Sequence, residues 1–309
     1  MVDIPADVVD EVFRLLRPPR VPALPAPKTA RVKQALHACT LVSRSWRALA
    51  QPHLFDDVNY SFMNIRGDTG ALQITGTEAR WGWSSVHLQW PPLKTFSAFY
   101  DFLRGCPALA RCVHRLSTVA LFPGHPYEPE NGATEAIPLF SFIGLLQLLP
   151  SLQKLSLREL KLDVPRGHRF TPSSSHSLDK LEISNGAVRL TRSVLAGILG
   201  CFRAIGSLDV HMYTFELSDP PSDAELANSL VLSGRAAVEH LEIAIMTDPR
   251  TYDEVLSKFL DLARIASIVI FPSWRFWAYQ SLVDAASPRL REATVTHYPA
   301  SQSRLRRAP

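Results

Sequence analysis

The chain has 309 residues, of which 46% are hydrophobic and 20% are charged, with a formal net charge of +4 at pH 7. This composition is typical of a globular protein and excludes a largely disordered chain. The small positive excess lies near the end of the chain, so we expect no broad basic surface for nucleic acid. The longest apolar stretch, 137–149, is shorter than the ~20 residues of a membrane span, so we expect no membrane contact.

The four cysteines are far apart in the sequence and form no C-x-x-C pair: Cys39, Cys106, Cys112 and Cys201. We therefore expect buried free thiols in a reducing compartment. Acidic residues such as Asp3 and Asp7 interrupt any apolar run at the start, so no signal peptide is predicted. Together these features favour a cytoplasmic or nuclear location, or both.

The first 54 residues predict two amphipathic helices. Pro5 starts the first helix, and Val8 and Val12 lie on its apolar stripe. The second is predicted from 35 onward as one helix that Pro52 ends. Between them, residues 17–33 contain five prolines, so this insert is predicted to be a solvated, partly extended loop.

From residue 55 to about 300 a six-residue frame recurs, apolar-x-x-apolar-x-apolar, and each frame ends in the alternation of a strand. Its apolar positions are Phe55-Val58-Tyr60, Trp83-Val86-Leu88, Leu116-Val119-Leu121, Leu152-Leu155-Leu157, Leu178-Leu181-Ile183, Ile205-Leu208-Val210, Val238-Leu241-Ile243, Ile265-Ile268-Ile270 and Leu290-Ala293-Val295. Helices are predicted between most frames, at 95–104, 139–149, 193–202, 224–232, 252–263 and 274–286. A strand and a helix repeated in this way predict a solenoid with a curved parallel sheet.

The N-terminal region resembles the F-box motif of fungal F-box proteins. The likeness is carried by Ile4-Pro5 and by 36–55, LHACTLVSRSWRALAQPHLF. The sequence differs from the usual motif in having Ile4 for Leu, Asp7 for Glu and the long Pro-rich insert. The resemblance implies a helical F-box domain at 1–54 that binds a Skp-type adaptor of a cullin ubiquitin ligase. The residues expected to support that docking are Ile4, Pro5, Val8, Val12, Leu36, Val42 and Trp46.

The recurring frame resembles leucine-rich repeats, most clearly at 152–160, LQKLSLREL. The Asn or Cys usual after the strand is absent, so an irregular, degenerate solenoid is expected at 55–300. Residues 301–309 would form a basic tail. The predicted fold class is therefore α/β, a small helical F-box followed by a leucine-rich-repeat-like solenoid.

If the apolar positions of each frame point inward, the intervening side chains lie on the concave face of the sheet. The carboxylates of Glu182, Asp209 and Glu242 then share one column, separated by the ~4.8 Å spacing of neighbouring strands. One interpretation is a docking surface for a target protein, formed by Lys180, Glu182, Asp209, His211, His240 and Glu242. The alternative is a solvated face in which Lys180 and His240 are counter-ions.

No catalytic, metal-binding or cofactor-binding motif occurs, so we expect no enzyme, no metal and no cofactor. The resemblances imply a substrate-recognition subunit of a Skp–cullin–F-box ubiquitin ligase that binds an unidentified target protein. One alternative is a repeat scaffold in which the N-terminal helices only cap the solenoid. Another is a hydrolase on an open α/β sheet, which would need a deep pocket with converging polar groups.

Overall fold

The computed structural model describes residues 11–12, 26–63, 95–121, 136–163, 176–185, 192–212, 235–245, 256–271, 280–286 and 288–295. Several predictions concern residues outside these ranges: Ile4, Pro5, Val8, the strand at 83–88, the helix at 224–232 and the tail 301–309. Within the described ranges, no helix combines the length and the apolar character needed to cross a bilayer.

Residues 26–55 form two helices, α2 (Ala26–Val42) and α3 (Arg44–Phe55), in place of the single helix predicted from 35 onward. The break falls at Ser43, whose backbone is extended at φ −158° and ψ 169°. Its hydroxyl oxygen accepts a hydrogen bond from the backbone N–H of Trp46 at 3.2 Å. Serine is a preferred N-cap residue, so this bond starts a new helix where the apolar periodicity alone suggested continuation.

Two predictions about proline in this region were wrong. Pro52 lies inside α3, which continues to Phe55. Proline has no backbone N–H, so the Ala48 carbonyl lacks its usual i+4 donor, but α3 keeps its helical geometry past this position. The predicted loop at 17–33 is already helical from Ala26, with Pro27 in the first turn of α2. First-turn N–H groups have no partner within the helix, so proline costs little at that position.

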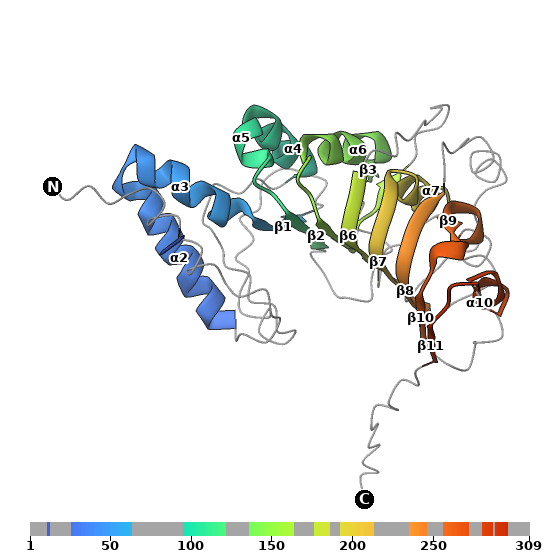
Figure 1. The fold of residues 1–309 in the computed structure, drawn as a ribbon. Coiled ribbons are helices and arrows are strands. Elements are labelled where there is room, and N and C mark those ends of the chain that lie inside the picture. The colour runs from blue at the N-terminus through green and yellow to red at the C-terminus, as the bar shows by residue number, and fades with distance from the viewer. Residues whose placement is uncertain are drawn as a thin grey trace, which may run out of the picture.

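The fold is α/β and is built on a large parallel sheet (Figure 1). Every neighbouring pair runs parallel, in the order β1 (Asp57–Met63), β2 (Arg115–Leu121), β4 (Lys154–Arg158), β6 (His176–Asn185), β7 (Phe202–Met212), β8 (Ala236–Ile245), β10 (Ser267–Phe271) and β11 (Glu292–Val295). β9 (Leu260–Asp261) also pairs with β8, and β3 (Ile137–Pro138) pairs with β5 (Leu162–Asp163) in a second small sheet. β1 is bonded directly to β2.

Several described helices lie close to predicted positions, namely α4 (Phe96–Gly105), α6 (Leu139–Leu148) and α7 (Arg192–Leu199). The described residues also include the short α5 (Pro107–Ala110), the 3₁₀ turn η2 (Leu262–Arg264) and α10 (Gln280–Ala286). The helix predicted at 252–263 is shorter, because β9 and η2 occupy its second half. Figure 1 shows α4, α6 and α7 following one another along one side of the sheet.

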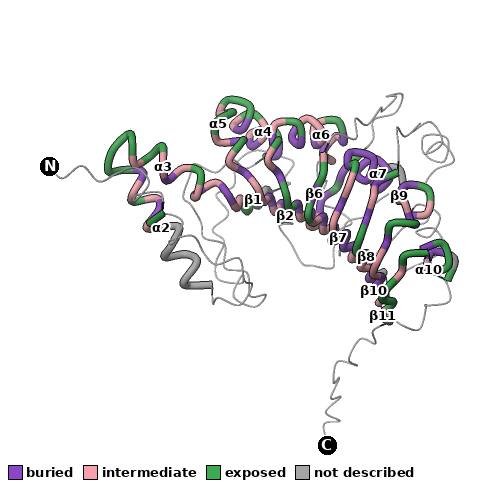
Figure 2. The backbone as a smooth tube through the Cα atoms, viewed as in Figure 1, coloured by how far each residue is buried: buried purple, intermediate pink, exposed green. Residues whose placement is uncertain are grey.

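The core lies between these helices and the sheet, where side chains of equivalent frame positions form rows. One row is formed in register by Val58, Leu116, Leu155, Leu181, Leu208, Leu241, Ile268 and Ala293. From Leu116 to Ile268 each member is at most 1% exposed. Figure 2 shows these buried positions along the central strands. Burial of such a continuous row is the main stabilising term of a sheet of this kind.

The frame assigned to β2 was out of phase. Leu116, not Val119, pairs with Leu155, so the frame of this strand is Val113-Leu116-Thr118. Thr118 is 1% exposed, and its hydroxyl donates a hydrogen bond to the backbone oxygen of Ser156 at 3.4 Å. The apolar frame did not include this position because Thr118 carries a hydroxyl group.

A repeated backbone arrangement explains why two residues separate the first two apolar positions of each frame. A single carbonyl oxygen accepts hydrogen bonds from both intervening residues of the next strand, at distances of 2.8–3.3 Å. The accepting carbonyls are those of Asp56, His114, Gln153 and Ala266. The same forked contact therefore occurs in β2, β4, β6 and β11, and these four strands are equivalent in this respect.

The cysteines are free, as predicted, but only Cys201 is buried. Its thiol donates a hydrogen bond to the backbone oxygen of Gly197 at 3.1 Å, and burial raises its pKa to about 12. Cys39, Cys106 and Cys112 are half-buried, contrary to the prediction of four buried thiols. They lie in or beside the helices of the first half of the chain.

Candidate functional site

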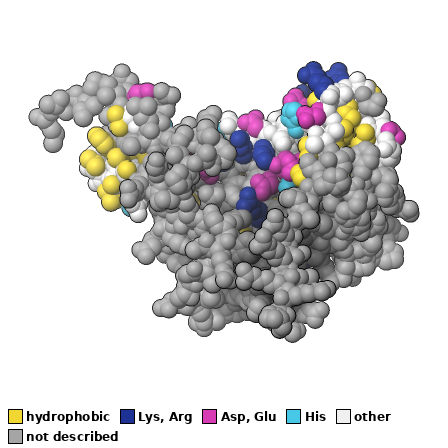
Figure 3. All heavy atoms as spheres, turned by 90° about the horizontal axis from the view of Figure 1, so that it is seen from below, with side chains coloured by type: hydrophobic (Ala, Val, Ile, Leu, Met, Phe, Trp, Pro, Cys, Tyr) yellow, Lys and Arg dark blue, Asp and Glu magenta, His cyan; other side chains and the backbone are white. Residues whose placement is uncertain are grey.

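The polar side chains predicted to form a docking surface lie on neighbouring strands. Glu182 of β6 is in register with Asp209 of β7, and Asp209 is in register with Glu242 of β8. The predicted column of carboxylates is therefore confirmed. Figure 3 shows Lys, Arg, Asp and Glu side chains gathered in a hollow on the side viewed from below.

Each carboxylate of the column contacts a basic group on the strand that precedes it. Oε1 of Glu182 lies 2.8 Å from Nη2 of Arg158 on β4. Nζ of Lys180 on β6 lies 2.5 Å from Oδ2 of Asp209. His211 of β7 lies with Nε2 at 3.2 Å from Oε1 of Glu242. The result is a diagonal series across β4, β6, β7 and β8, formed by two ion pairs and one imidazole–carboxylate contact, which offsets the repulsion among the carboxylates. We refer to these six residues as the ion-pair diagonal.

Asp209 is the most buried carboxylate of this diagonal, at 7% exposure. Besides the Lys180 ammonium, it accepts a hydrogen bond from the Ser207 hydroxyl at 2.9 Å. Burial lowers the pKa of Lys180, but the hydrogen bond to Asp209 and the charges of Asp209, Glu182 and Glu242 outweigh it, so the net pKa is raised. Lys180 therefore stays protonated, and it neutralises a carboxylate that water barely reaches.

The counter-ions differ in part from those predicted. Lys180 is one of them, but Glu242 contacts His211 rather than His240. Arg158, which pairs with Glu182, was not among the predicted site residues. The frame predicts that Arg158 lies on the same face as Ser156, two residues further along the strand. The frame does not predict the diagonal direction of the pairs, because that direction depends on side-chain rotamers.

Asp209, His211 and Glu242 also bring one potential metal-ligating atom each within 4.8 Å of one another. Such a trio could hold a divalent cation only if its present partners moved. Lys180 already contacts Asp209, and His211 already contacts Glu242. The ammonium would also repel a cation, so the arrangement favours internal ion pairing over metal binding.

Replacing Lys180 by Met should lower the free energy of unfolding by about 1–2 kcal/mol, because Asp209 would keep its burial and lose its counter-ion. The partial exposure of the lysine side chain keeps the loss below that of a fully buried pair. Since the folded-state pKa of Lys180 is raised, the contribution is present below the ordinary lysine pKa of 10.5 and disappears as the pH rises through the folded-state value.

Urea unfolding of Lys180→Met and Lys154→Met at pH 7.5 checks this expectation. Lys154 is an exposed lysine in register with Lys180, so its replacement removes the same charge from the neighbouring strand. We expect a change within about 0.5 kcal/mol for this control. Equal effects of the two variants would contradict a specific role for the Lys180–Asp209 pair.

The residues predicted for adaptor docking divide into buried and exposed groups. Leu36 is 0% exposed and packs with Ala50 and Leu54 inside the α2–α3 pair, so its side chain is not available to a partner. Trp46 is half-buried against the same cluster. Val12 and Val42 are exposed, at 47% and 65%.

Two further residues near these helices differ from what the sequence suggested: Leu41 was not predicted as a docking residue, and Asp56 was interpreted as a turn or edge charge. Leu41, beside Val42 at the end of α2, is 70% exposed, and Figure 2 shows this turn as an exposed part of the tube. The single-helix prediction did not indicate the exposure of Leu41, because it placed Leu41 and Val42 inside a continuous helix. In the structure both residues end α2, just before the break at Ser43. Asp56 is 6% exposed and lies with Oδ1 at 3.0 Å from Nδ1 of His114, which joins the end of α3 to the start of β2.

Comparison with models of protein families found no match to this sequence. A search among curated proteins likewise found no significant relative.

Proposed function

We propose that this chain is the substrate-recognition subunit of a Skp–cullin–F-box type ubiquitin ligase. In this proposal residues 1–54 form an F-box domain that binds a Skp-type adaptor. Residues 55–300 form a degenerate leucine-rich-repeat solenoid that binds the target protein, and partner subunits carry out ubiquitin transfer.

The observation that carries the proposal is the exposure of Leu41 and Val42 at the turn of an otherwise packed helix pair. Two adjacent large apolar side chains at 70% and 65% exposure favour contact with another molecule. They belong to the LVSRSW segment on which the resemblance depends. The packing of Leu36, Ala50 and Leu54 supports a preformed helix pair that presents this turn.

The repeated forked hydrogen bonds and the parallel register support the second half of the proposal. Equivalent strand entries are expected of a repeat protein, in which each unit contacts its neighbours. The target would then contact the ion-pair diagonal and His240. Because the carboxylates of the diagonal already have basic partners, a target would need both acidic and basic groups to exchange with them.

The adaptor half is tested by the double variant Leu41→Asp/Val42→Asp in the full chain. We expect its affinity for a purified fungal Skp adaptor to fall at least about ten-fold, because two charges would enter an apolar contact. Phe140→Asp is the matched control, since Phe140 is 54% exposed on α6, far along the chain from the turn. Surface plasmon resonance gives the affinities, and circular dichroism checks that each variant is folded.

A second candidate, the capping scaffold, is favoured by the Asp56–His114 contact. Through it the end of α3 is fixed to the first two strands of the sheet, as a cap would be. In that case the wild-type chain would not bind the adaptor above background. Unchanged binding by the Leu41→Asp/Val42→Asp variant would contradict the assignment of the docking surface.

A further inference from the structure

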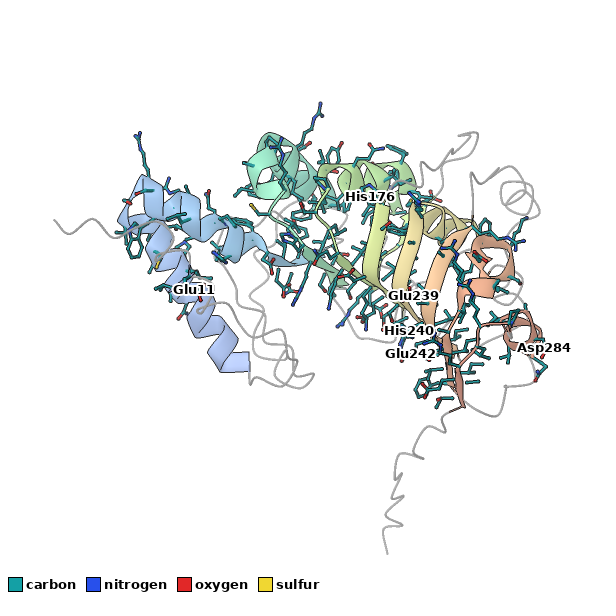
Figure 4. The ribbon with its side chains drawn as sticks, viewed as in Figure 1. Glu11, His176, Glu239, His240, Glu242 and Asp284 are labelled. Atoms are coloured by element: carbon teal, nitrogen blue, oxygen red, sulfur yellow. The ribbon has the colours of Figure 1, made fainter. Side chains whose placement is uncertain are left out.

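A cleft lies where β10 and β11 begin, beside the middle of β8. Its cavity volume is about 720 Å³, within the range of roughly 300–1,000 Å³ typical of ligand sites. The described residues that line it are Glu239, His240, Arg264, Ala266, Pro288, Arg289, Leu290 and Arg291. Figure 4 labels Glu239 and His240 at this end of the sheet, near β10 and β11.

The backbone fixes three of these segments at the same level. The N–H of Ala266 donates to the carbonyl oxygen of Glu239, and the N–H of Arg291 donates to that of Ala266, both at 2.8 Å. Val238 and Leu241 are buried on either side of Glu239 and His240, which leaves both of these side chains exposed. The cleft is therefore bordered by rigid strand starts, and its polar side chains reach it from adjacent chain segments.

The residues that line the cleft include three arginines, Arg264, Arg289 and Arg291, and one histidine, His240. Arg264 is held in place by a contact of 3.2 Å between its Nε atom and Oδ2 of Asp261. A guanidinium has five N–H donors, so this contact leaves its terminal amino groups able to bind an anion. Arg289 and Arg291 are exposed, and no described residue forms an ion pair with either of them. Even with Glu239 and Asp261 counted against the three arginines, the cleft is positively charged.

We infer that this cleft binds a phosphate monoester. The planar fork of arginine matches the oxygens of phosphate in paired hydrogen bonds, and several such groups around one cleft favour a doubly charged oxyanion. The volume greatly exceeds that of a phosphate ion, so the group that carries the phosphate has room beside Pro288 and Leu290. This inference does not depend on adaptor binding, because the cleft and the α2–α3 turn lie at opposite ends of the sheet (Figure 1).

Isothermal titration calorimetry of the full chain at low ionic strength tests the inference with O-phosphoserine, inorganic phosphate, succinate and serine. We expect saturable binding of O-phosphoserine, weaker binding of inorganic phosphate and no binding of serine. The double variant Arg289→Gln/Arg291→Gln should weaken the binding of O-phosphoserine at least about ten-fold, since hydrogen bonds to charged groups are the stronger ones. Arg289→Lys/Arg291→Lys keeps the charge but not the fork, and should fall between that variant and the wild type.

Arg104→Gln/Arg111→Gln is the charge-matched control. Both residues are exposed, at the end of α4 and just after α5, and their loss changes the net charge equally. Binding should be unchanged in this control if the cleft is the site. If both glutamine double variants weakened the binding of O-phosphoserine equally, the effect would come from net charge alone, and the inference would be overturned. It would also be overturned by equally tight binding of succinate, or by the absence of saturable binding to the wild-type chain.

Discussion

Leu208→Ala should lower the free energy of unfolding by about 2–5 kcal/mol. Leu208 is 0% exposed and lies in the centre of the apolar row, between Leu181 of β6 and Leu241 of β8. Its truncation removes buried apolar surface and leaves a cavity that two flanking strands, themselves fixed in the sheet, can fill only in part.

Urea denaturation followed by circular dichroism measures this loss. Leu41→Ala is the matched control, because it makes the same chemical change at a leucine that is 70% exposed. The control should change the stability by no more than about 0.5 kcal/mol. If the two leucine variants were equally stable, the apolar row would not be the core that supports the sheet.

The sheet was largely predictable because its apolar residues recur at fixed positions of a six-residue frame. From β4 to β11 the predicted frames match the observed register, so that Leu155 and Ile270, for example, lie in the rows expected for them. Burial on one face forces such periodicity, since a shift of one residue would place every apolar side chain on the wrong face. Among the described strands, the predicted phase was wrong in β2, where Thr118 replaces an aliphatic residue, because composition alone cannot show that a neighbouring carbonyl accepts its hydroxyl proton.

The helix break and the ion pairs were harder to predict for different reasons. Ser43 carried a capping signal, but the apolar period ran through it and suggested one helix, with Val42 and Leu36 on a single face. Both residues lie in α2, but Leu36 packs against Ala50 and Leu54 of α3, whereas Val42 is the last residue before the turn and is exposed. The column of carboxylates followed from strand register, whereas the partners of Glu182 and Glu242 depended on the reach of long side chains across neighbouring strands.

Gly206→Ala should lower the free energy of unfolding by about 1–3 kcal/mol, although alanine is usually the better residue in regular structure. Gly206 lies in β7, where a Cβ atom would be 2.7 Å from the backbone oxygen of Asp179 on β6. A backbone atom of a paired strand cannot rotate away as a side chain can. The two strands would have to separate locally, next to the Lys180–Asp209 pair and to Leu208.

Gly105→Ala provides the matched control, and it should change stability in the opposite direction. Gly105 is the last residue of α4, and a Cβ atom there would have no atom within 4 Å. Alanine in a helix loses less conformational entropy on folding than glycine, so this variant should be unchanged or up to about 1 kcal/mol more stable. Thermal or urea unfolding of both variants gives the two signs. A stabilised Gly206→Ala variant would mean that β6 and β7 can separate at little cost, so that the close approach at Gly206 is not required by the pairing of the central strands.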